Sequence, residues 1–276
     1  MMLGNTAAST LTFHQWRHAQ VRLSRLECDL LLAHVMQMSR SQILARPEQT
    51  LDERQLSHLQ RLSQQLVEGT PLAYILGEKE FFGLSMTVNP AVLVPRPETE
   101  LLVEVALQLL RPGDRVLDAG TGSGAIAVAL ANSQPQLHVD ASDRSASALE
   151  VGQANAQRHN VAINFIQSDW FTGLTGSRWD MIVSNPPYIA ANDPHLAALH
   201  AEPAGALVAD DNGFADLFEL IAGAPAFLNS GGWLLLEHGY NQAAQVRTAL
   251  LERGFTDVCS FTDLGNIERV SQGRFV

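Results

Sequence analysis

The stretch Val116-Leu117-Asp118-Ala119-Gly120-Thr121-Gly122-Ser123-Gly124 decides the fold that this sequence predicts. Its first four residues are typical of a buried strand, and three alternating glycines separate that strand from a helix expected to begin at Ala125. Glycine permits a tight turn and a close approach of a ligand to the backbone, and the first turn of a helix presents free N–H groups. We therefore interpret the stretch as a strand, a ligand-binding turn that includes Thr121 and Ser123, and a helix.

The carboxylate of Asp143 indicates what kind of ligand such a turn binds. Asp143 follows the next predicted strand, 23 residues after Gly120, where a carboxylate can accept both hydroxyl hydrogens of a ribose. The spacing Gly120-x-Gly122-x-x-Ala125 also fits the looser dinucleotide fingerprint. The turn by itself therefore predicts adenosine binding but no particular cofactor.

Two plainer alternatives stay open at this turn. The glycines could close a strand-to-helix connection without a ligand, while Asp143 caps the next helix near Ser145. Asp118 could contact the cofactor, or it could hold the glycine loop through backbone N–H bonds.

Strands and helices alternate along the chain from Glu98 onward. Strands are expected at Arg115–Ala119, His138–Ser142, Asn164–Gln167, Asp180–Ser184, Trp233–Glu237, Asp257–Phe261 and Arg269–Phe275, and helices at Ala125–Asn132, Ser145–His159, Phe214–Leu228 and Gln242–Arg253. This alternation predicts an α/β fold, a Rossmann-like doubly wound sheet with ligands at the carboxyl ends of its strands. The last two strands have no helix between them and are expected to pair antiparallel.

The residues before this region predict a second, smaller domain. Apolar residues recur at helical spacing from Leu23 to Met38 and from Leu51 to Leu66, the latter behind a start signal at Thr50 and Asp52,. Tyr74 to Val94 alternates loosely and suggests a β-hairpin. We therefore expect a helical domain over residues 1–70, a hairpin linker over 71–97 and the α/β domain over 98–276.

The tetrapeptide Asn185-Pro186-Pro187-Tyr188, which follows the fourth strand, is the most specific motif in the chain. The two prolines hold the backbone extended and have no N–H, so the carbonyl of Pro186 is free to face a ligand. Asn185 adds a side-chain carbonyl, and Tyr188 adds a flat face. Two acceptors that converge in this way suit a planar NH₂ group.

Such a pair of acceptors would help a planar nitrogen to accept a methyl group. The nitrogen of an amide or an aromatic amine shares its lone pair with a π system and is a poor nucleophile toward a methyl group. Two acceptors on its N–H bonds raise the electron density on the nitrogen and orient it for in-line attack. No strong base is required, because the proton can leave after the methyl group has been transferred.

Charge and composition narrow the classes of partner. The sequence has 18 basic and 29 acidic residues, Lys79 being the only lysine. Residues 1–69 carry a net charge of +1 and residues 70–276 a net charge of -12, which disfavours contact with a phosphate backbone. Cys28 and Cys259 match no metal spacing and predict two reduced, buried thiols.

Other signals predict a soluble cytoplasmic protein without a metal. Met1 to Thr10 shows no secretory signal, and no apolar run approaches the roughly 20 residues that cross a bilayer. The histidines before residue 70 (His14, His18, His34 and His58) show no metal-ligand spacing. His238 is expected to be structural, although its role stays open.

With both motifs in view, the sequence resembles the class I S-adenosylmethionine-dependent methyltransferases that act on planar nitrogens, and among them the HemK/PrmC family. That family methylates the glutamine amide of the Gly-Gly-Gln tripeptide in bacterial peptide chain release factors. The similarity spans nearly the whole chain, and its further matching stretches are Pro71–Tyr74, Phe81–Gly83, Leu93–Glu100, Ser168–Phe171 and Leu234–Gly239.

The resemblance implies roles for individual residues. Those expected to bind S-adenosylmethionine are Asp118, Gly120, Thr121, Gly122, Ser123, Gly124, Asp143, Asp169, Trp170 and Asn185. Those expected to bind the substrate amide are Asn185, Pro186, Pro187 and Tyr188, with Arg96 and Glu100 at the entrance; the catalytic ones are Asn185, Pro186 and Tyr188. Residues 97–99 also look like the start of a helix. The products would be the methylated release factor and S-adenosylhomocysteine, and we expect a monomer that binds no nucleic acid and no membrane.

One segment departs from the family pattern. Between Leu196 and Glu202 the family usually has a longer loop, and this chain has only Ala197–Ala201. Three other functions stay open: methylation of a ribosomal-protein glutamine, N6 methylation of adenine in a nucleic acid, and a dinucleotide oxidoreductase or noncatalytic nucleotide-binding module.

Overall fold

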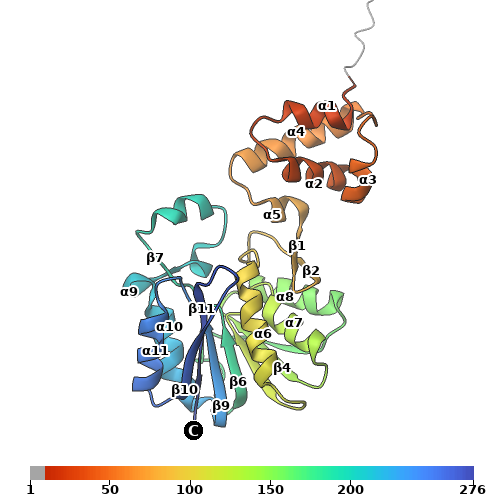
Figure 1. Ribbon diagram of the computed structural model, residues 1–276. Coiled ribbons are helices and arrows are strands. Elements are labelled where there is room, and N and C mark those ends of the chain that lie inside the picture. Colours follow the sequence, from red (N-terminus) through yellow and green to blue (C-terminus); the bar gives the residue numbers. More distant parts are fainter. Residues whose placement is uncertain (1–9) are drawn as a thin grey trace, which may run out of the picture. The chain divides into compact units, whose positions relative to one another are not determined.

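The computed structural model describes residues 10–276. It divides into two compact units, one reaching to Leu76 and one spanning Gly77–Val276 (Figure 1). The expectation of no secretory signal concerns Met1 to Thr10 and so falls, apart from Thr10, outside the described residues. Within residues 10–276 no helix has both the length and the apolar character needed to cross a membrane.

Helices that are specified by local signals make up the described part of the first unit. They are α1 (Phe13–Ala19), α2 (Arg25–Met36), α3 (Arg40–Leu44), α4 (Glu53–Val67) and α5 (Leu72–Leu76). Ser24, Ser39 and Asp52 cap α2, α3 and α4, each side chain accepting from the N–H three residues onward,. Their apolar faces meet in a core centred on residues such as Leu31 and Leu59, which are fully buried,.

A two-stranded hairpin opens the second unit. It consists of β1 (Glu78–Phe81) and β2 (Leu84–Thr87), and its turn places Phe82 and Gly83 at φ values of 52° and 74°. The expected hairpin is present, but it begins at Glu78 and not near Tyr74, because Tyr74 lies in α5. The linker role of residues 71–97 stays a prediction.

The second unit is built on a seven-stranded sheet. Its strands are β3 (Arg115–Ala119), β4 (His138–Asp143), β5 (Ile163–Gln167), β6 (Trp179–Ser184), β9 (Leu228–Glu237), β10 (Thr256–Thr262) and β11 (Glu268–Arg274). They lie in the order β10-β11-β9-β6-β3-β4-β5, and all neighbours are parallel except the two pairs made by β11. The α/β prediction and the antiparallel pairing of the last two strands are confirmed. The strand order reverses between β3 and β6, because the chain runs outward from β3 through β4 and β5 and then returns to the other side of β3. Doubly wound sheets bind ligands at such a point.

Helices cover both faces of this sheet (Figure 1). On one face lie α6 (Glu100–Leu109), α7 (Ala125–Ser133) and α8 (Ala146–Arg158), and on the other α10 (Ala215–Gly223) and α11 (Ala243–Glu252). Val116 packs into the first of these cores and its neighbour Leu117 into the second. Because both faces are buried, the consecutive residues Val116 and Leu117 are both apolar, without the alternation of a half-exposed strand,.

Short elements complete the second unit. They are η1 (Pro97–Thr99), β7 (Ile189–Ala190), η2 (Pro194–Leu199), η3 (Ala204–Ala206), β8 (Val208–Ala209), α9 (Asp210–Gly213) and η4 (Ala224–Ala226), with β7 and β8 paired in parallel. The long helix expected over Phe214–Leu228 was wrong at its end, because α10 stops at Gly223 and β9 begins at Leu228. Pro225 has no N–H to continue an α-helical ladder.

The two cysteines differ in their surroundings. Cys28 is buried in the first unit, as expected, and Cys259 is exposed. The expectation for Cys259 was wrong because β10 is the edge strand of the sheet, and Cys259 alternates with the more buried residues on either side of it. Both thiols are free.

Candidate active site

A cavity of about 200 Å³ lies where β3, β4 and β6 end. Its walls come from the glycine turn, from the residues that follow β4, β5 and β6, and from two segments further away in sequence, residues 91–99 and 203–206. Of the residues predicted for the site, ten line this cavity: Arg96, Gly120, Thr121, Gly122, Ser123, Asp143, Asp169, Trp170, Asn185 and Pro187. The parallel sheet brings them together because the carboxyl ends of its strands meet at one edge.

The three glycines of the turn have three different surroundings. A Cβ atom at Gly120 would lie 3.1 Å from the Trp170 ring, and one at Gly124 would lie 3.0 Å from Cα of Gly152. At Gly122 a Cβ atom would meet nothing within 4 Å. Gly120 therefore admits the indole, Gly124 allows α7 and α8 to pack closely, and Gly122 leaves open the space that a ligand needs.

Gly122→Ala and Gly124→Ala are expected to damage different properties. Both residues have positive φ (55° and 77°), so each alanine costs about 1–2 kcal/mol of stability. Gly124→Ala also collides with Gly152 and should lower the free energy of unfolding by about 2–5 kcal/mol. Gly122→Ala should weaken cofactor binding by about 10- to 100-fold, because its methyl group occupies ligand space at a cost of about 1–3 kcal/mol.

Thermal denaturation and cofactor titration of both variants test this assignment. Gly113→Ala is the matched control, because Gly113 also has positive φ (91°) and an empty Cβ position but lies outside the cavity. A Gly122→Ala protein that binds the cofactor as tightly as Gly113→Ala would contradict the assignment.

Asp143 holds the glycine turn while it faces the cavity. Its Oδ2 accepts a hydrogen bond from the N–H of Gly122 at 2.9 Å, and its Oδ1 accepts one from the N–H of Ser145 at 2.9 Å. A carboxylate has about four acceptor positions, so both oxygens keep capacity for ligand hydroxyls. The capping contact with Ser145, foreseen as the plainer alternative, therefore exists without excluding ribose binding.

Asp118 lies behind the turn and does not line the cavity. Its Oδ2 accepts from the Thr121 hydroxyl at 2.6 Å and from the N–H of Ala127 at 3.2 Å, and burial raises its pKa to about 7. Of the two roles left open, this geometry favours support of the loop. Gly124 is likewise absent from the cavity wall.

Trp170 forms one wall of the cavity. Its backbone has φ of 42°, and its indole Nε1 donates to Asp216 Oδ1 at 3.0 Å. Asp216 was missed by the sequence analysis, and partial burial raises the pKa of its carboxyl group. The indole is thus held against Gly120 with its orientation fixed from behind.

Asn185 presents its side chain at the end of β6. Its Nδ2 donates to Thr99 Oγ1 at 3.0 Å, which leaves Oδ1 as the free acceptor of the amide. Pro187 also lines the cavity, whereas Pro186 and Tyr188 do not. The predicted contacts of Pro186 and Tyr188 with substrate stay predictions.

Tyr188 instead joins a buried carboxylate that the sequence analysis gave no role. Its hydroxyl donates to Glu237 Oε1 at 3.2 Å. Glu237 is 1% exposed, and burial raises its pKa to about 7 against the lowering effect of hydrogen bonds from Thr99 and Tyr188. The available signal was an acidic residue at the end of the apolar run Leu234–Leu236.

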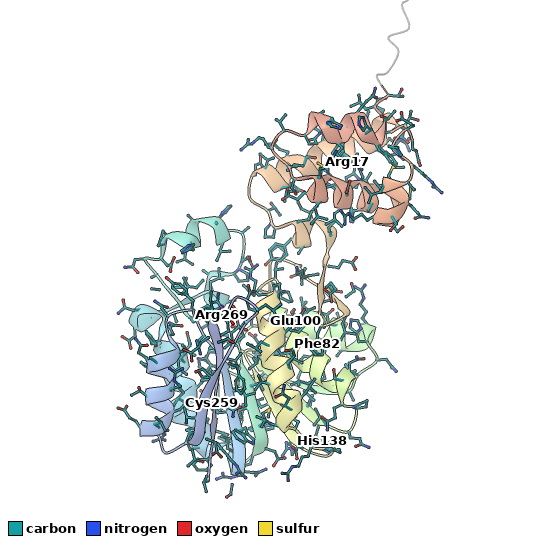
Figure 2. All side chains as sticks on the ribbon, viewed as in Figure 1. Arg17, Phe82, Glu100, His138, Cys259 and Arg269 are labelled. Atoms are coloured by element: carbon teal, nitrogen blue, oxygen red, sulfur yellow. The ribbon has the colours of Figure 1, made fainter. Side chains whose placement is uncertain are left out.

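Arg96 and Glu100 were both predicted at the substrate entrance, but they make different contacts in the structure. Arg96 lines the cavity and pairs with Glu202 (Nη2 to Oε1, 2.5 Å). Glu100 accepts from the N–H of Phe82 at 3.0 Å and so ties the hairpin turn to α6. Figure 2 labels Glu100 and Phe82 beside each other. Glu100 lies in the first turn of α6 and outside the cavity wall.

The shortened segment before Glu202 is anchored on the cavity rim. Glu202 is 7% exposed and also accepts from the N–H of Val94 at 3.0 Å. Arg144 donates to the carbonyl of Gly205 at 2.9 Å. Residues 203–206 thereby complete a wall that sequence patterns did not reveal.

His238 lies in a separate buried network. Its Nδ1 is 3.0 Å from the carbonyl oxygen of Gly239, which can only accept, so Nδ1 carries the proton,. Its Nε2 is 2.8 Å from the Ser271 hydroxyl, and burial lowers its pKa. This network favours the structural role expected for His238.

Comparison with known proteins extends these findings. Residues 97–207 match a family model described as "Methyltransferase small domain", and residues 10–77 match the "PrmC N-terminal domain". A methyltransferase from Pyrococcus furiosus has a similar fold (TM-score 0.55, 19% identity, 78% of this chain and 98% of that one). So does the T. thermophilus 16S rRNA N2 G1207 methyltransferase, solved with AdoMet and guanosine (TM-score 0.55, 21% identity, 72% of this chain and 50% of that one).

The reversing strand order, the glycine turn and the cavity beside them define a doubly wound α/β protein with a ligand site, and the family match of residues 97–207 makes it a methyltransferase. A curated relative from Burkholderia pseudomallei, "Release factor glutamine methyltransferase", is 46% identical over 263 residues, covering 91% of this chain and 92% of its own. The chain belongs to the release factor glutamine methyltransferase family, and the resemblance inferred from its motifs is confirmed.

Proposed function

We propose that this protein transfers a methyl group from S-adenosylmethionine to the side-chain amide nitrogen, N5, of the glutamine in the Gly-Gly-Gln motif of peptide chain release factors. The observation that carries the proposal is the orientation of Asn185. With Nδ2 engaged by Thr99 at 3.0 Å, its Oδ1 is available at the cavity to accept from an amide NH₂.

The cavity residues fit S-adenosylmethionine. Gly122 leaves space beside the turn, Asp143 offers acceptors for ribose hydroxyls, and the Trp170 ring supplies a flat wall for the adenine. We assign cofactor binding to these residues together with Gly120, Thr121, Ser123 and Asp169. S-adenosylmethionine supplies an electrophilic methyl group on a sulfonium.

The side chains around the substrate amide orient and activate its nitrogen. Asn185 Oδ1 and the carbonyl of Pro186 accept from its two N–H bonds, which raises electron density on the nitrogen. Pro187 and Tyr188 flank this position. No side chain has to act as a strong base, because the nitrogen becomes far more acidic once it is methylated.

We further propose how the chain is divided and where it works. Residues 1–70 recognise the partner, residues 71–97 link, and residues 98–276 carry the transfer. A net charge of -12 over residues 70–276 supports a protein partner over nucleic acid. Arginines of the first domain suit carboxylates on that partner. We place the enzyme in the cytoplasm as a monomer, without a metal.

Incubation with a release factor and S-adenosylmethionine, followed by mass spectrometry, tests the function. We expect one added methyl group, located on the glutamine of Gly-Gly-Gln. A release factor with that glutamine changed to alanine is the control and should stay unmodified. Methylation of DNA or of a ribosomal protein, with the release factor untouched, would overturn the proposal.

A further inference from the structure

Glu237 is a buried carboxylate that lies behind the residues of the cavity wall. It ends β9, is 1% exposed and does not line the cavity. Its Oε1 accepts from the Tyr188 hydroxyl at 3.2 Å. Its Oε2 is buried without a hydrogen-bond partner among the described residues, and the Thr99 hydroxyl lies close enough to lower the pKa of the carboxyl group. Thr99, which lines the cavity, and Tyr188, which does not, therefore both lie beside one acid.

The protonation state of Glu237 determines whether the Thr99 hydroxyl can donate its hydrogen to Glu237 or to Asn185. An ionised carboxylate can only accept, and a threonine hydroxyl has one hydrogen to give. If Thr99 donates that hydrogen to Glu237, its oxygen is left to accept, and only the NH₂ side of the Asn185 amide can satisfy it. Asn185 then faces the cavity with its oxygen.

The opposite state follows from a neutral acid. A protonated Glu237 can donate to Thr99, which frees the hydroxyl of Thr99 to donate to Asn185. The amide of Asn185 can then turn its NH₂ toward the cavity. Two NH₂ groups, one of Asn185 and one of the substrate, would face each other without an acceptor between them.

We propose that Glu237 is a positioning residue, which acts through Thr99 to keep the acceptor oxygen of Asn185 turned toward the substrate amide. The inference rests on the proposed function for the identity of that amide. The hydrogen-bond direction itself is a property of this chain alone.

The surroundings of Glu237 place its titration in an accessible pH range. The ionisable or hydrogen-bonding groups that face it are Thr99 and Glu98 from η1, Tyr188 after β6 and Arg269 from β11. Burial, which is the largest effect, and the charge of Glu98 both raise the pKa of Glu237, which lies at about 7. The positive charge of Arg269, labelled in Figure 2, opposes this but is itself paired with Asp263 at 3.0 Å.

Activity and stability should therefore respond to pH in opposite directions. The active, ionised form of Glu237 grows as pH rises through about 7, so kcat should rise. Because the folded-state pKa of Glu237 lies above its ordinary value of 4.5, its contribution to the free energy of unfolding is fully present below pH 4.5 and is lost as pH rises through about 7,. A merely structural role would produce only the second effect.

Glu237→Gln tests the inference, with Glu268→Gln as the matched control. Glu268 lies on β11, pairs with Arg247 of α11 at 2.6 Å and does not line the cavity. We expect Glu237→Gln to lower kcat at pH 8 by on the order of 10²-fold and to abolish the rise of kcat through pH 7, with the affinity for S-adenosylhomocysteine unchanged. Glu268→Gln should keep the wild-type profile. Thr99→Ser should retain the rise and Thr99→Val should lose it.

A measurement without substrate separates this inference from the proposed function. In full-length protein labelled with ¹⁵N-asparagine, the Asn185 amide signal, assigned by its loss in Asn185→Ser, should titrate near pH 7 in the wild type and not in Glu237→Gln. An Asn185 signal that titrates equally in both proteins overturns the inference, as does an unchanged kcat profile in Glu237→Gln. Failure to methylate the release factor would overturn only the proposed function, because the amide titration still decides the inference.

Discussion

Asn185→Ala is expected to lower kcat toward the release factor by about 10²- to 10³-fold, the loss typical when one preorganised polar contact to the reacting group is removed. The substrate amide would lose the Oδ1 acceptor, so its nitrogen would be neither activated nor held in line. Affinity for the cofactor should be largely retained, because the hydrogen bond of the Asn185 side chain goes to Thr99 and not to the glycine turn or Asp143. Single-turnover kinetics and calorimetric titration with S-adenosylhomocysteine measure the two effects separately.

Asn164→Ala provides the comparison for this variant. Asn164 is exposed near the start of β5 and donates to Asp140 Oδ1 at 2.8 Å, so its removal should leave turnover near wild type. A parallel loss of turnover and cofactor binding in Asn185→Ala would mean that Asn185 holds the cofactor more than the substrate.

Asp143→Ala is expected to abolish most cofactor affinity. Hydrogen bonds to a charged group contribute about 1.5–3 kcal/mol each, so loss of the ribose contacts alone should raise Kd by about 10- to 100-fold. The variant also removes the acceptor for the N–H of Gly122, bonded at 2.9 Å, so the turn loses its anchor at the same time. Calorimetric titration gives the change in Kd directly.

Two further variants show which part of the Asp143 side chain matters. Asp143→Asn keeps one acceptor oxygen and should fall between Ala and wild type. Asp114→Asn alters a carboxylate that accepts from the N–H of Arg111 at 2.8 Å, before β3 begins, and should leave affinity unchanged. Wild-type affinity in Asp143→Ala would remove Asp143 from the cofactor site.

Much of the fold was predictable because its signals are local. The strand before Gly120 is buried on both faces and therefore has apolar residues at consecutive positions, Val116 and Leu117,. Capping residues such as Asp52 marked helix starts from neighbouring positions alone. The end of the helix after Phe214 was missed because Leu228 is apolar in either a helix or a strand, and periodicity cannot separate the two.

The site was predictable where a residue follows directly from a strand end. Asp143 and Asn185 lie at the cavity because β4 and β6 flank β3 in a parallel sheet. Pro186 and Glu100 do not line it, since a motif specifies which residues occur together but not which way each side chain turns. Asp216, which orients the indole of Trp170, had no pattern that could announce it.

By itself, the sequence determined the class of fold, the glycine turn with its neighbouring carboxylate, and the tetrapeptide that suits a planar NH₂ group. Each of these depends on residues close together in the chain, where periodicity, backbone restriction and side-chain chemistry act directly. Only the tertiary structure brought Thr99 and Glu237 to Asn185, because contacts between segments far apart in sequence depend on how the sheet and its helices pack. The direction of a hydrogen bond, and with it the acceptor that faces the substrate, is decided at those contacts.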